Sequence, residues 1–396
     1  MYPEDAHLGH RIRQIRHARG KSLAVVAGLA GISKSHLGNI ETGERALDRR
    51  SLIVALANAL EVAPSEITGL VPSVLPGQDG DDRALMEVRL ALLAVSMNEP
   101  RGEVQPVELL RSRVADVVAA QNNADNAGVG AVLPALIRDL HTTADAHRNE
   151  REVLRLLTLT HMQGTQAWLT TIGAPLDLAW QAATFARQVA ERLDEPASLA
   201  VSAYGTALGL LSAGAFDLAS RAVAAVELPL VRVEEVHIAG SLALASSLIS
   251  ASRKDQTERA AALGHAAELA ERTGDSNVLG FGFGPSNVAV WRMQGALEIG
   301  EFAEAASIAE TVIPGALRVR ARQAVYWREY GRALARFPRQ RDNAVRMLRR
   351  AELISPDHVH RHPLTRSTLA ELLARAKRDA VGRELLGMAY RAGLSR

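Results

Sequence analysis

The sequence predicts an all-α protein with a small N-terminal domain and a long region of helical repeats. From Arg83 onward, alanine and leucine recur at spacings of three and four residues, as on the buried faces of packed helices. No stretch shows the strict apolar–polar alternation of a half-buried strand. A short motif also recurs within this region, which is typical of a helical array.

The N-terminal domain is predicted from residues 22–45, which have the pattern of two short helices joined by a tight turn. Ser22 and Ser33 each precede a helix-forming run, where a serine oxygen accepts hydrogen bonds from the first free amides. The small residues of 27–32 include glycine where two crossing helices must turn sharply. The residues spaced to share one small core are Val26, Ile32, Leu37 and Ile40.

The second of these helices has a polar outer face near its N-terminus, formed by Lys34, Ser35, His36 and Asn39. Such side chains carry the donors and acceptors that read base edges in the major groove. This pattern predicts a recognition helix, although the same spacing also fits an ordinary helix hairpin. The flanks favour the first interpretation, because amphipathic helices are predicted over 8–19 and 50–60 and Pro64 opens a short fifth helix.

Five short helices, with the hairpin as second and third, resemble the lambda-repressor-like DNA-binding domain of the Xre family. The resemblance covers residues 8–70 and is closest over Gly31–Gly43. It implies that Lys34, Ser35 and Asn39 contact bases and that Arg45 and Arg49, in the next loop, contact phosphate. Ser33 and His36, in the same helix start, complete the predicted contact set.

Two positions depart from the family pattern. Leu23 stands where many relatives have a glutamine that binds a phosphate, so this contact is either missing or replaced by Arg13 or Lys21. Gly38 lies inside the recognition helix, where glycine costs about 1 kcal/mol relative to alanine. It either permits close approach to DNA or has no function there.

The charge distribution agrees with a nucleic-acid partner for the N-terminal domain. The whole chain has a net charge of +2, yet residues 11–50 hold nine Lys or Arg and three Asp or Glu. Duplex DNA is attracted to such a surface whatever its sequence. Residues 51–316 have a net charge of −14 and residues 317–396 of +12. Either the acidic middle packs against the basic end, which we favour, or the basic end is a second surface facing nucleic acid.

Length and composition limit the remaining possibilities. A chain of 396 residues exceeds one small helical domain, and the absence of cysteine excludes disulfides and thiolate metal sites. Without a signal peptide or a run of about 18 apolar residues, we expect a cytoplasmic, nucleoid-associated protein with no membrane partner. The predicted domains are a helix-turn-helix domain over 1–70, a linker over 71–82 and a helical-repeat domain over 83–396.

The repeat is visible as two matching motifs. Residues 213–219, AGAFDLA, match residues 299–305, IGEFAEA, 86 positions later, and each motif has a glycine at an expected helix–helix turn. Two units of about 43 residues exceed the usual tetratricopeptide period of about 34, so we predict a tetratricopeptide-like helical solenoid. Solenoids of this kind present a concave face to peptides or small ligands.

One segment, residues 280–287 (GFGFGPSN), interrupts the helical pattern just before a predicted helix. It is either a structured turn with its aromatic rings in the core or the wall of a ligand pocket. In the second interpretation the pocket residues are the aromatic Phe281, Phe283 and Trp291 and the polar anchors Asn287 and Arg292.

Three histidines, His358, His360 and His362, occur at alternate positions between two prolines. They would bind a metal only on an extended backbone, and we favour a solvated loop or a DNA-backbone contact, so we predict neither a metal site nor a cofactor. No nucleophile elbow and no paired-histidine zinc motif occurs, so we do not expect an enzyme.

The whole chain resembles the actinobacterial helix-turn-helix regulators that carry a long tetratricopeptide-like C-terminal region. This likeness rests on the N-terminal motif, FGPSNV (283–288) and RHPLTR (361–366). It implies a transcription factor that responds to a small-molecule or peptide effector. One recognition helix reads too few base pairs, so we expect a homodimer on a palindromic operator in double-stranded DNA. The alternative is a DNA-tethered adaptor whose solenoid binds a protein partner.

Overall fold

The fold is all-α, as the sequence predicts. The computed structural model describes residues 8–69, 79–147 and 150–394, and every regular element in those ranges is a helix. One isolated antiparallel bridge joins Ser276 to Phe283. The N-terminal domain, called the head below, comprises α1 (Leu8–Ala18), α2 (Leu23–Leu29), α3 (Lys34–Glu41), α4 (Arg50–Leu60) and α5 (Pro64–Thr68).

The predicted caps and core order the head. The Ser22 Oγ accepts a hydrogen bond from the Val25 N–H, and the Ser33 Oγ accepts one from the His36 N–H. Both capping predictions are therefore confirmed. Of the predicted core residues, Val26, Leu37 and Ile40 are fully buried, and Ile32 packs against them partly buried.

A buried ion pair joins α1 to the end of α3. The Arg16 guanidinium donates to both carboxylate oxygens of Glu41, at 2.7 and 2.8 Å, and to the Lys21 carbonyl at 3.1 Å. The hydrogen bond to Glu41 raises the pKa of Arg16. A bidentate pair of this kind restricts orientation as well as distance, so it fixes the recognition helix relative to α1.

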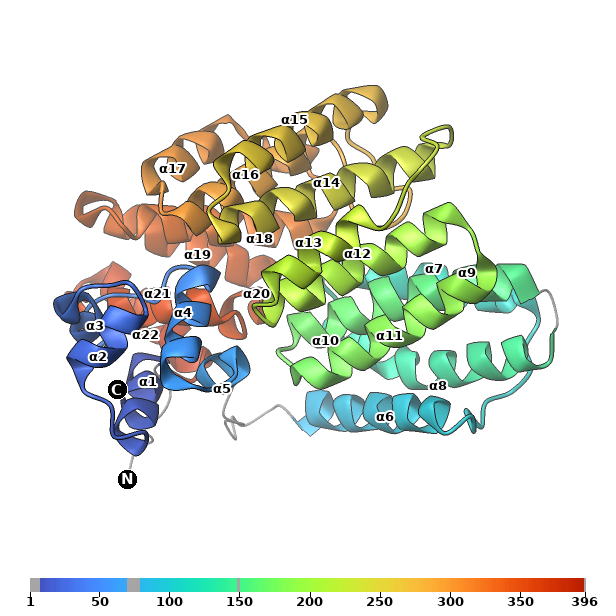
Figure 1. Cartoon of the computed structure of the whole chain (residues 1–396), viewed down its shortest axis with the longest axis horizontal. Helices are drawn as coiled ribbons and strands as arrows, with labels where there is room; N and C mark the ends of the chain where they lie inside the picture. The colour runs from blue at the N-terminus through green and yellow to red at the C-terminus, as the bar shows by residue number, and fades with distance from the viewer. Residues whose placement is uncertain (1–7, 70–78, 148–149, 395–396) are drawn as a thin grey trace.

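The remainder of the described chain, the repeat domain, consists of helix pairs joined by short turns. Its α-helices are α6 (Asp79–Ser96), α7 (Val107–Asn122), α8 (Asn126–Asp145), α9 (Glu150–Leu159), α10 (Ala167–Thr171), α11 (Leu176–Leu193), α12 (Pro196–Ser212), α13 (Phe216–Ala224), α14 (Val233–Arg253), α15 (Gln256–Thr273), α16 (Pro285–Ile299), α17 (Phe302–Thr311), α18 (Arg320–Leu334), α19 (Arg341–Ile354), α20 (Pro356–His360), α21 (Pro363–Ala374) and α22 (Ala380–Arg391). A π-helical turn, η2 (Thr160–Gln166), joins α9 to α10. Figure 1 shows α6–α13 and α14–α19 as two layered halves, with α20–α22 returning beside the head. Most of the predicted linker, residues 71–82, lies outside the described residues, and α6 already begins at Asp79.

The repeated motif forms the same turn twice. Gly214 lies between α12 and α13, and Gly300 lies between α16 and α17, with φ values of 79° and 87° that favour glycine. Ala219 and Ala305, five residues further along, are fully buried in the helix that follows. The predicted helix turns are therefore confirmed.

Both repeat turns face the head. A Cβ atom at Gly214 would lie 2.6 Å from a methyl group of Val54 in α4, and one at Gly300 would lie 3.3 Å from the Arg49 guanidinium. Leu364 of α21 is also buried within the head's own hydrophobic core. The head is therefore packed against the repeat domain rather than joined to it by the linker alone.

Polar contacts hold the loop that follows α3, residues 42–49. The Ala46 N–H donates to Glu371 Oε2 at 3.1 Å, and the Leu47 N–H donates to Ser367 Oγ at 2.7 Å. Both acceptors belong to α21. Because the two donors are buried backbone amides, each would be costly to leave unpaired.

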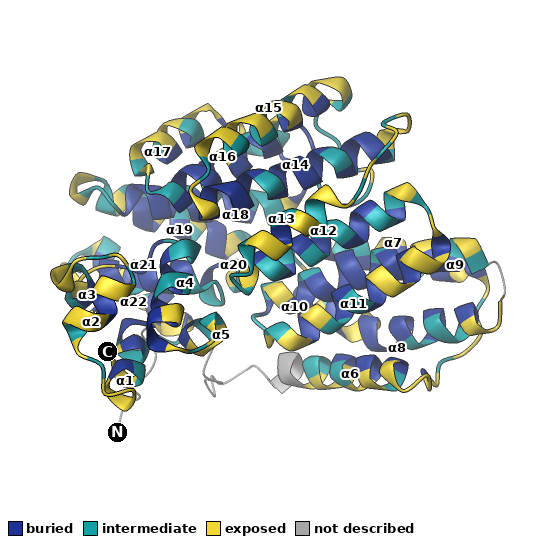
Figure 2. Ribbon diagram, viewed as in Figure 1, coloured by how far each residue is buried: buried dark blue, intermediate teal, exposed yellow. Residues whose placement is uncertain are grey.

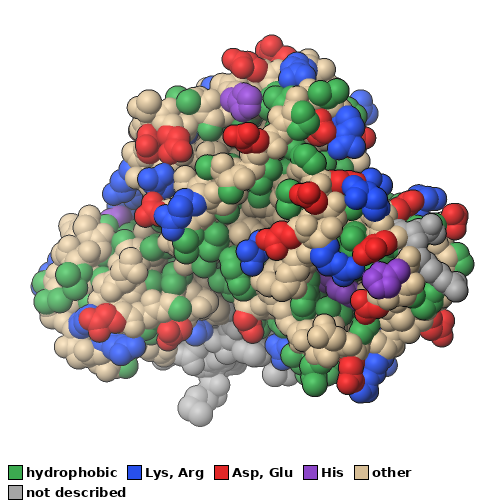
Figure 3. All heavy atoms as spheres, turned by 45° about the vertical axis from the view of Figure 1, so that its right-hand side comes forward, with side chains coloured by type: hydrophobic (Ala, Val, Ile, Leu, Met, Phe, Trp, Pro, Cys, Tyr) green, Lys and Arg blue, Asp and Glu red, His purple; other side chains and the backbone are tan. Residues whose placement is uncertain are grey.

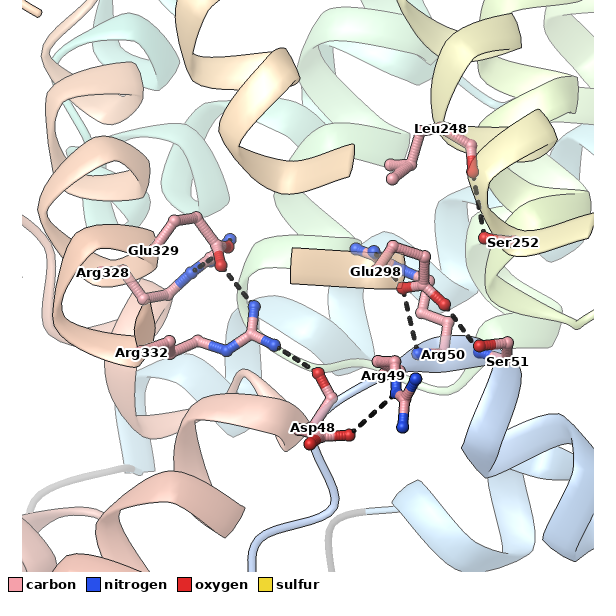
Figure 4. A network of polar contacts seen from close by, with 10 residues as sticks. All are labelled: Asp48, Arg49, Arg50, Ser51, Leu248, Ser252, Glu298, Arg328, Glu329 and Arg332. Atoms are coloured by element: carbon pink, nitrogen blue, oxygen red, sulfur yellow. Dashed lines mark hydrogen bonds and ion pairs between the residues drawn. The ribbon is translucent and has the colours of Figure 1, made fainter. Parts of the chain in front are cut away.

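The start of α4 is held from two other helices, as Figure 4 shows. The Arg50 and Ser51 amides donate to the two carboxylate oxygens of Glu298, in α16, at 3.1 and 2.8 Å. Arg332 of α18 donates to the Asp48 carbonyl at 2.8 Å and is itself paired with Glu329. Burial alone would raise the pKa of Glu329, but Arg332 and Arg328 lower it to about 2.

The ion pairs do not support the favoured explanation of the charge segregation, although α16 and α17 of the acidic middle pack against α18 of the basic end. Within the described ranges, every carboxylate of residues 317–394 forms an ion pair with an arginine or a histidine of that same segment. The acidic middle instead contributes Glu298 to the head. The basic end is therefore not explained by pairing with the acidic middle.

Glu298→Gln tests the docking of the head. The variant replaces a charged acceptor of two amides by a neutral side chain that has one acceptor, which should weaken docking by about 1.5–3 kcal/mol. We expect amide exchange of residues 46–53 in the full chain to accelerate roughly tenfold or more. Hydrogen-exchange mass spectrometry measures this, with the exposed Glu304→Gln in α17 as control. Equal protection in the two variants would contradict the role given to Glu298.

Candidate nucleic-acid interface

The outer face of α3 carries the predicted base-reading residues. Lys34, Ser35 and Asn39 are exposed, whereas Leu37 and Ile40 on the opposite face are buried. Figure 2 shows exposed residues along α2 and α3, at the edge of the head away from α6–α19. The helix therefore presents donors and acceptors to solvent from a fixed position, which is what a major-groove contact needs.

Ser33 and His36, at the start of the same helix, are less available to DNA than Lys34, Ser35 and Asn39. Ser33 is exposed, but its Oγ already caps α3. His36 is partly buried, and burial together with the charges of Arg45 and Arg49 lowers its pKa. Its Nε2 is buried and has no hydrogen-bond partner among the described residues, so His36 does not present that atom to solvent.

The two predicted phosphate contacts in the loop after α3 differ in accessibility. Arg45 is exposed. Arg49 is partly buried, donates to Asp48 Oδ1 at 3.2 Å and lies against Gly300. Arg45 is therefore the freer of the two cations, because Arg49 already contributes to docking.

The two candidate replacements for the missing glutamine also differ. The Lys21 Nζ donates to the Ala59 carbonyl and to Glu61 Oε1, both at 2.8 Å, so it ties the α1–α2 turn to the end of α4. Arg13 is exposed on α1. A phosphate would have to compete with two existing partners at Lys21 but not at the open position of Arg13.

Leu23 and Gly38, the two departures from the family pattern, face each other. A Cβ atom at Gly38 would lie 3.7 Å from a methyl group of Leu23, which is ordinary van der Waals contact. The space over Gly38 is therefore bordered by Leu23, and an alanine there would meet no clash within the head.

The predicted ligand-pocket segment packs against several helices of the repeat domain. Phe283 is buried with its ring over Gly240 of α14, and Phe281 packs edge-to-face on Tyr204 of α12 at 5.1 Å. The Leu279 carbonyl accepts a hydrogen bond from Gln163 in η2. The aromatic rings thus join the core, as the first of the two interpretations expected, and the segment connects helices from both halves.

A small cavity of about 10 Å³, room for about one water molecule, lies beside this segment. Its lining includes Asp275, Ser276, Phe283, Asn287, Arg318 and Arg322. Of the predicted pocket residues, Phe283 and Asn287 therefore line the cavity. Arg292 does not, because it is exposed on another face of α16.

Arg322, rather than Arg292, is the arginine that lies at the cavity as a polar anchor. Its Nε donates to Asn287 Oδ1 at 2.9 Å, and its guanidinium lies 5.5 Å from the centroid of the Trp291 ring. Its Nη2 is buried and has no hydrogen-bond partner among the described residues, and burial lowers the pKa of Arg322 to about 10. The signal that could have found it is the packing of α16 against α18, since first helices of successive pairs lie side by side.

The three histidines do not converge. Pro356 and Pro363 open α20 and α21 as first-turn prolines, so the backbone is helical rather than extended. The histidine contacts are separate: His358 with Ser355, His360 with Glu352 and His362 with Thr365. All three side chains are partly buried, so the solvated loop that we favoured is wrong. No group of three or more potential metal ligands occurs in the described part of the chain.

Comparison with known proteins gives one match. A family model described as a helix-turn-helix domain matches residues 7–68, which are the head. No curated protein and no solved structure matches the chain. The match supports a DNA-binding regulator and covers none of the repeat domain. No helix within the described ranges is long and apolar enough to span a membrane.

Proposed function

We propose that this protein is a sequence-specific DNA-binding transcriptional regulator that acts as a homodimer and responds to a small-molecule or peptide effector. The observation that carries the proposal is α3, inside the matched domain. Lys34, Ser35 and Asn39 are exposed on a helix whose opposite face is buried in the head's core. The Arg16–Glu41 pair fixes this helix, so its polar face can enter a major groove without rearrangement.

Lys34→Ala combined with Asn39→Ala should abolish sequence-specific binding. Each lost base contact is worth about 1–3 kcal/mol, so the pair should weaken operator binding by roughly 30-fold or more. Genome-wide mapping of bound sites would give the operator, which we expect to be palindromic, and fluorescence anisotropy would then compare the variants. The control is Ser65→Ala, exposed on α5. Unchanged specific binding by the double variant would refute the recognition-helix assignment.

An apolar stripe on α6, continued by Met97 just after the helix, supports the homodimer. Met86, Leu90, Leu93 and Met97 are spaced by four, three and four residues and are 46–72% exposed. The opposite face of α6, including Val88 and Leu92, packs into the repeat-domain core. A single helix that is apolar on both faces is typical of a helix–helix interface, and a two-fold axis would bring the same stripe of two copies together.

Leu90→Glu combined with Leu93→Glu should disrupt the dimer, because burying four carboxylates across one symmetric interface is unfavourable. Light scattering after size-exclusion chromatography should report a monomer, with weaker binding to a palindromic operator. The control, Leu218→Glu with Val231→Glu, changes two exposed apolar residues elsewhere. If wild type and variant have the same mass, the α6 stripe is not the dimer interface.

Two helices connect the cavity to the head and support effector sensing. In α16, Asn287 lies at the cavity and Glu298 binds the start of α4. In α18, Arg322 lies at the cavity and Arg332 binds the Asp48 carbonyl. About ten residues, or roughly 15 Å of helix, separate the two contacts in each case. Because the cavity holds only about one water molecule, an effector must push α16 and α18 apart to enter it. That movement would reposition each head and alter the half-site spacing that a dimer can read.

Arg322→Gln tests the sensor. A buried guanidinium with an unpaired Nη2 favours an anionic group on the effector. Cell extract from the source organism should release the wild-type protein from its operator but not the variant. Arg292→Gln, which changes an exposed arginine of α16, is the control. Release that persists in Arg322→Gln would exclude this cavity, and dependence of operator binding on a second protein would favour the adaptor alternative.

A further inference from the structure

The loop between α21 and α22, residues 375–379, lies beside the loop that follows the recognition helix. The Arg375 Nη2 donates to the Glu44 carbonyl at 2.6 Å. The Nη1 of Arg375 lies 3.4 Å from Glu371, the residue whose carboxylate also accepts from the Ala46 N–H. Arg375 therefore fixes the end of α21 against the head, one residue from the exposed Arg45.

Lys377 and Arg378 follow in the same loop, and both are exposed. Two or three residues of chain span at most about 11 Å, so Lys377 and Arg378 lie close to the contact between Arg375 and the head, which we call the seam. Asp379, the carboxylate next to them, is already engaged, since it accepts from the Gly382 N–H at 2.6 Å and pairs with Arg341. These two exposed cations therefore follow within three residues of Arg375, which contacts the head at Glu44, the residue before Arg45.

The face on the α6–α12 side of the molecule differs from the seam, because its exposed charges are mixed in sign. Figure 3, which turns the α6–α12 side forward, shows acidic and basic side chains interspersed over that face. Part of the excess positive charge of the C-terminal segment lies in the loop 375–379, beside the loop that follows the recognition helix.

We infer that the repeat domain contributes a second phosphate-binding element, in which Lys377 and Arg378 contact the DNA backbone beside the phosphates bound by Arg45. Contacts of this kind position a protein on the duplex without reading sequence. The inference rests on the proposed DNA binding by α3. It also requires that the head binds DNA while docked, because the seam exists only in the docked arrangement.

Lys377→Gln combined with Arg378→Gln in the full-length protein tests this element. Each neutralised phosphate contact contributes a slope of about 0.9 to the decrease of log K with log salt. We expect the variant's slope for a 30-base-pair duplex of arbitrary sequence to be shallower by about 1.8. Its affinity at 0.1 M salt should fall by about tenfold or more. Fluorescence anisotropy between about 50 and 300 mM salt, a roughly sixfold range, measures both the slope and the affinity.

The matched control is Lys254→Gln with Arg292→Gln, which removes one exposed lysine and one exposed arginine from α14–α16. If both double variants have the wild-type slope, the second phosphate-binding element does not exist. If the salt dependence of binding becomes shallower by the same amount in the control and in the test variant, the effect is one of net charge. That result would also overturn the inference. Failure of the wild-type protein to bind any duplex would instead refute the proposed function.

Discussion

The position of the head depends on a carboxylate that binds backbone amides. The N-cap residue of α4, Arg49, makes no side-chain cap, and Glu298 of α16 accepts from the first two amides instead, 248 positions along the chain. A carboxylate at a helix N-terminus gains both from hydrogen bonding and from the helix dipole. Because Glu298 is buried, separating the two domains would leave its charge and two amides to be solvated anew. The head therefore takes its orientation from the repeat domain.

This dependence makes the glycine-rich segment before α16 important to the whole arrangement. The segment contacts Gln163 in η2, Tyr204 in α12 and Gly240 in α14, and it ends where α16 begins. It thereby packs the two halves of the repeat domain against each other. A packed interior responds to displacement by shifting whole helices rather than deforming within them. Under the proposed effector response, a displacement of the segment would be transmitted along α16 to Glu298.

The sequence predicted contacts between residues that are close along the chain and missed contacts between residues that are far apart in it. Ser22 and Ser33 could be recognised as caps because the hydrogen bonds involved span three residues. Glu298 carries no such signal, since its partners lie in another domain. Arg292 is next to Trp291 in sequence, yet adjacent residues point about 100° apart around a helix, and it is Arg322 that reaches the cavity, from α18. The prolines that suggested an extended histidine segment instead begin helices.

The charge pattern illustrates why composition alone does not identify a nucleic-acid surface. Residues 317–396 contain 19 basic and seven acidic residues, and each of the seven carboxylates takes part in an ion pair within the segment. Several of these pairs are buried and serve packing, as Glu329 does beside the head. A cation used in this way cannot also bind phosphate. What matters for a DNA contact is therefore the surplus that is exposed beside α3, and at the seam with the head that surplus includes Lys377 and Arg378.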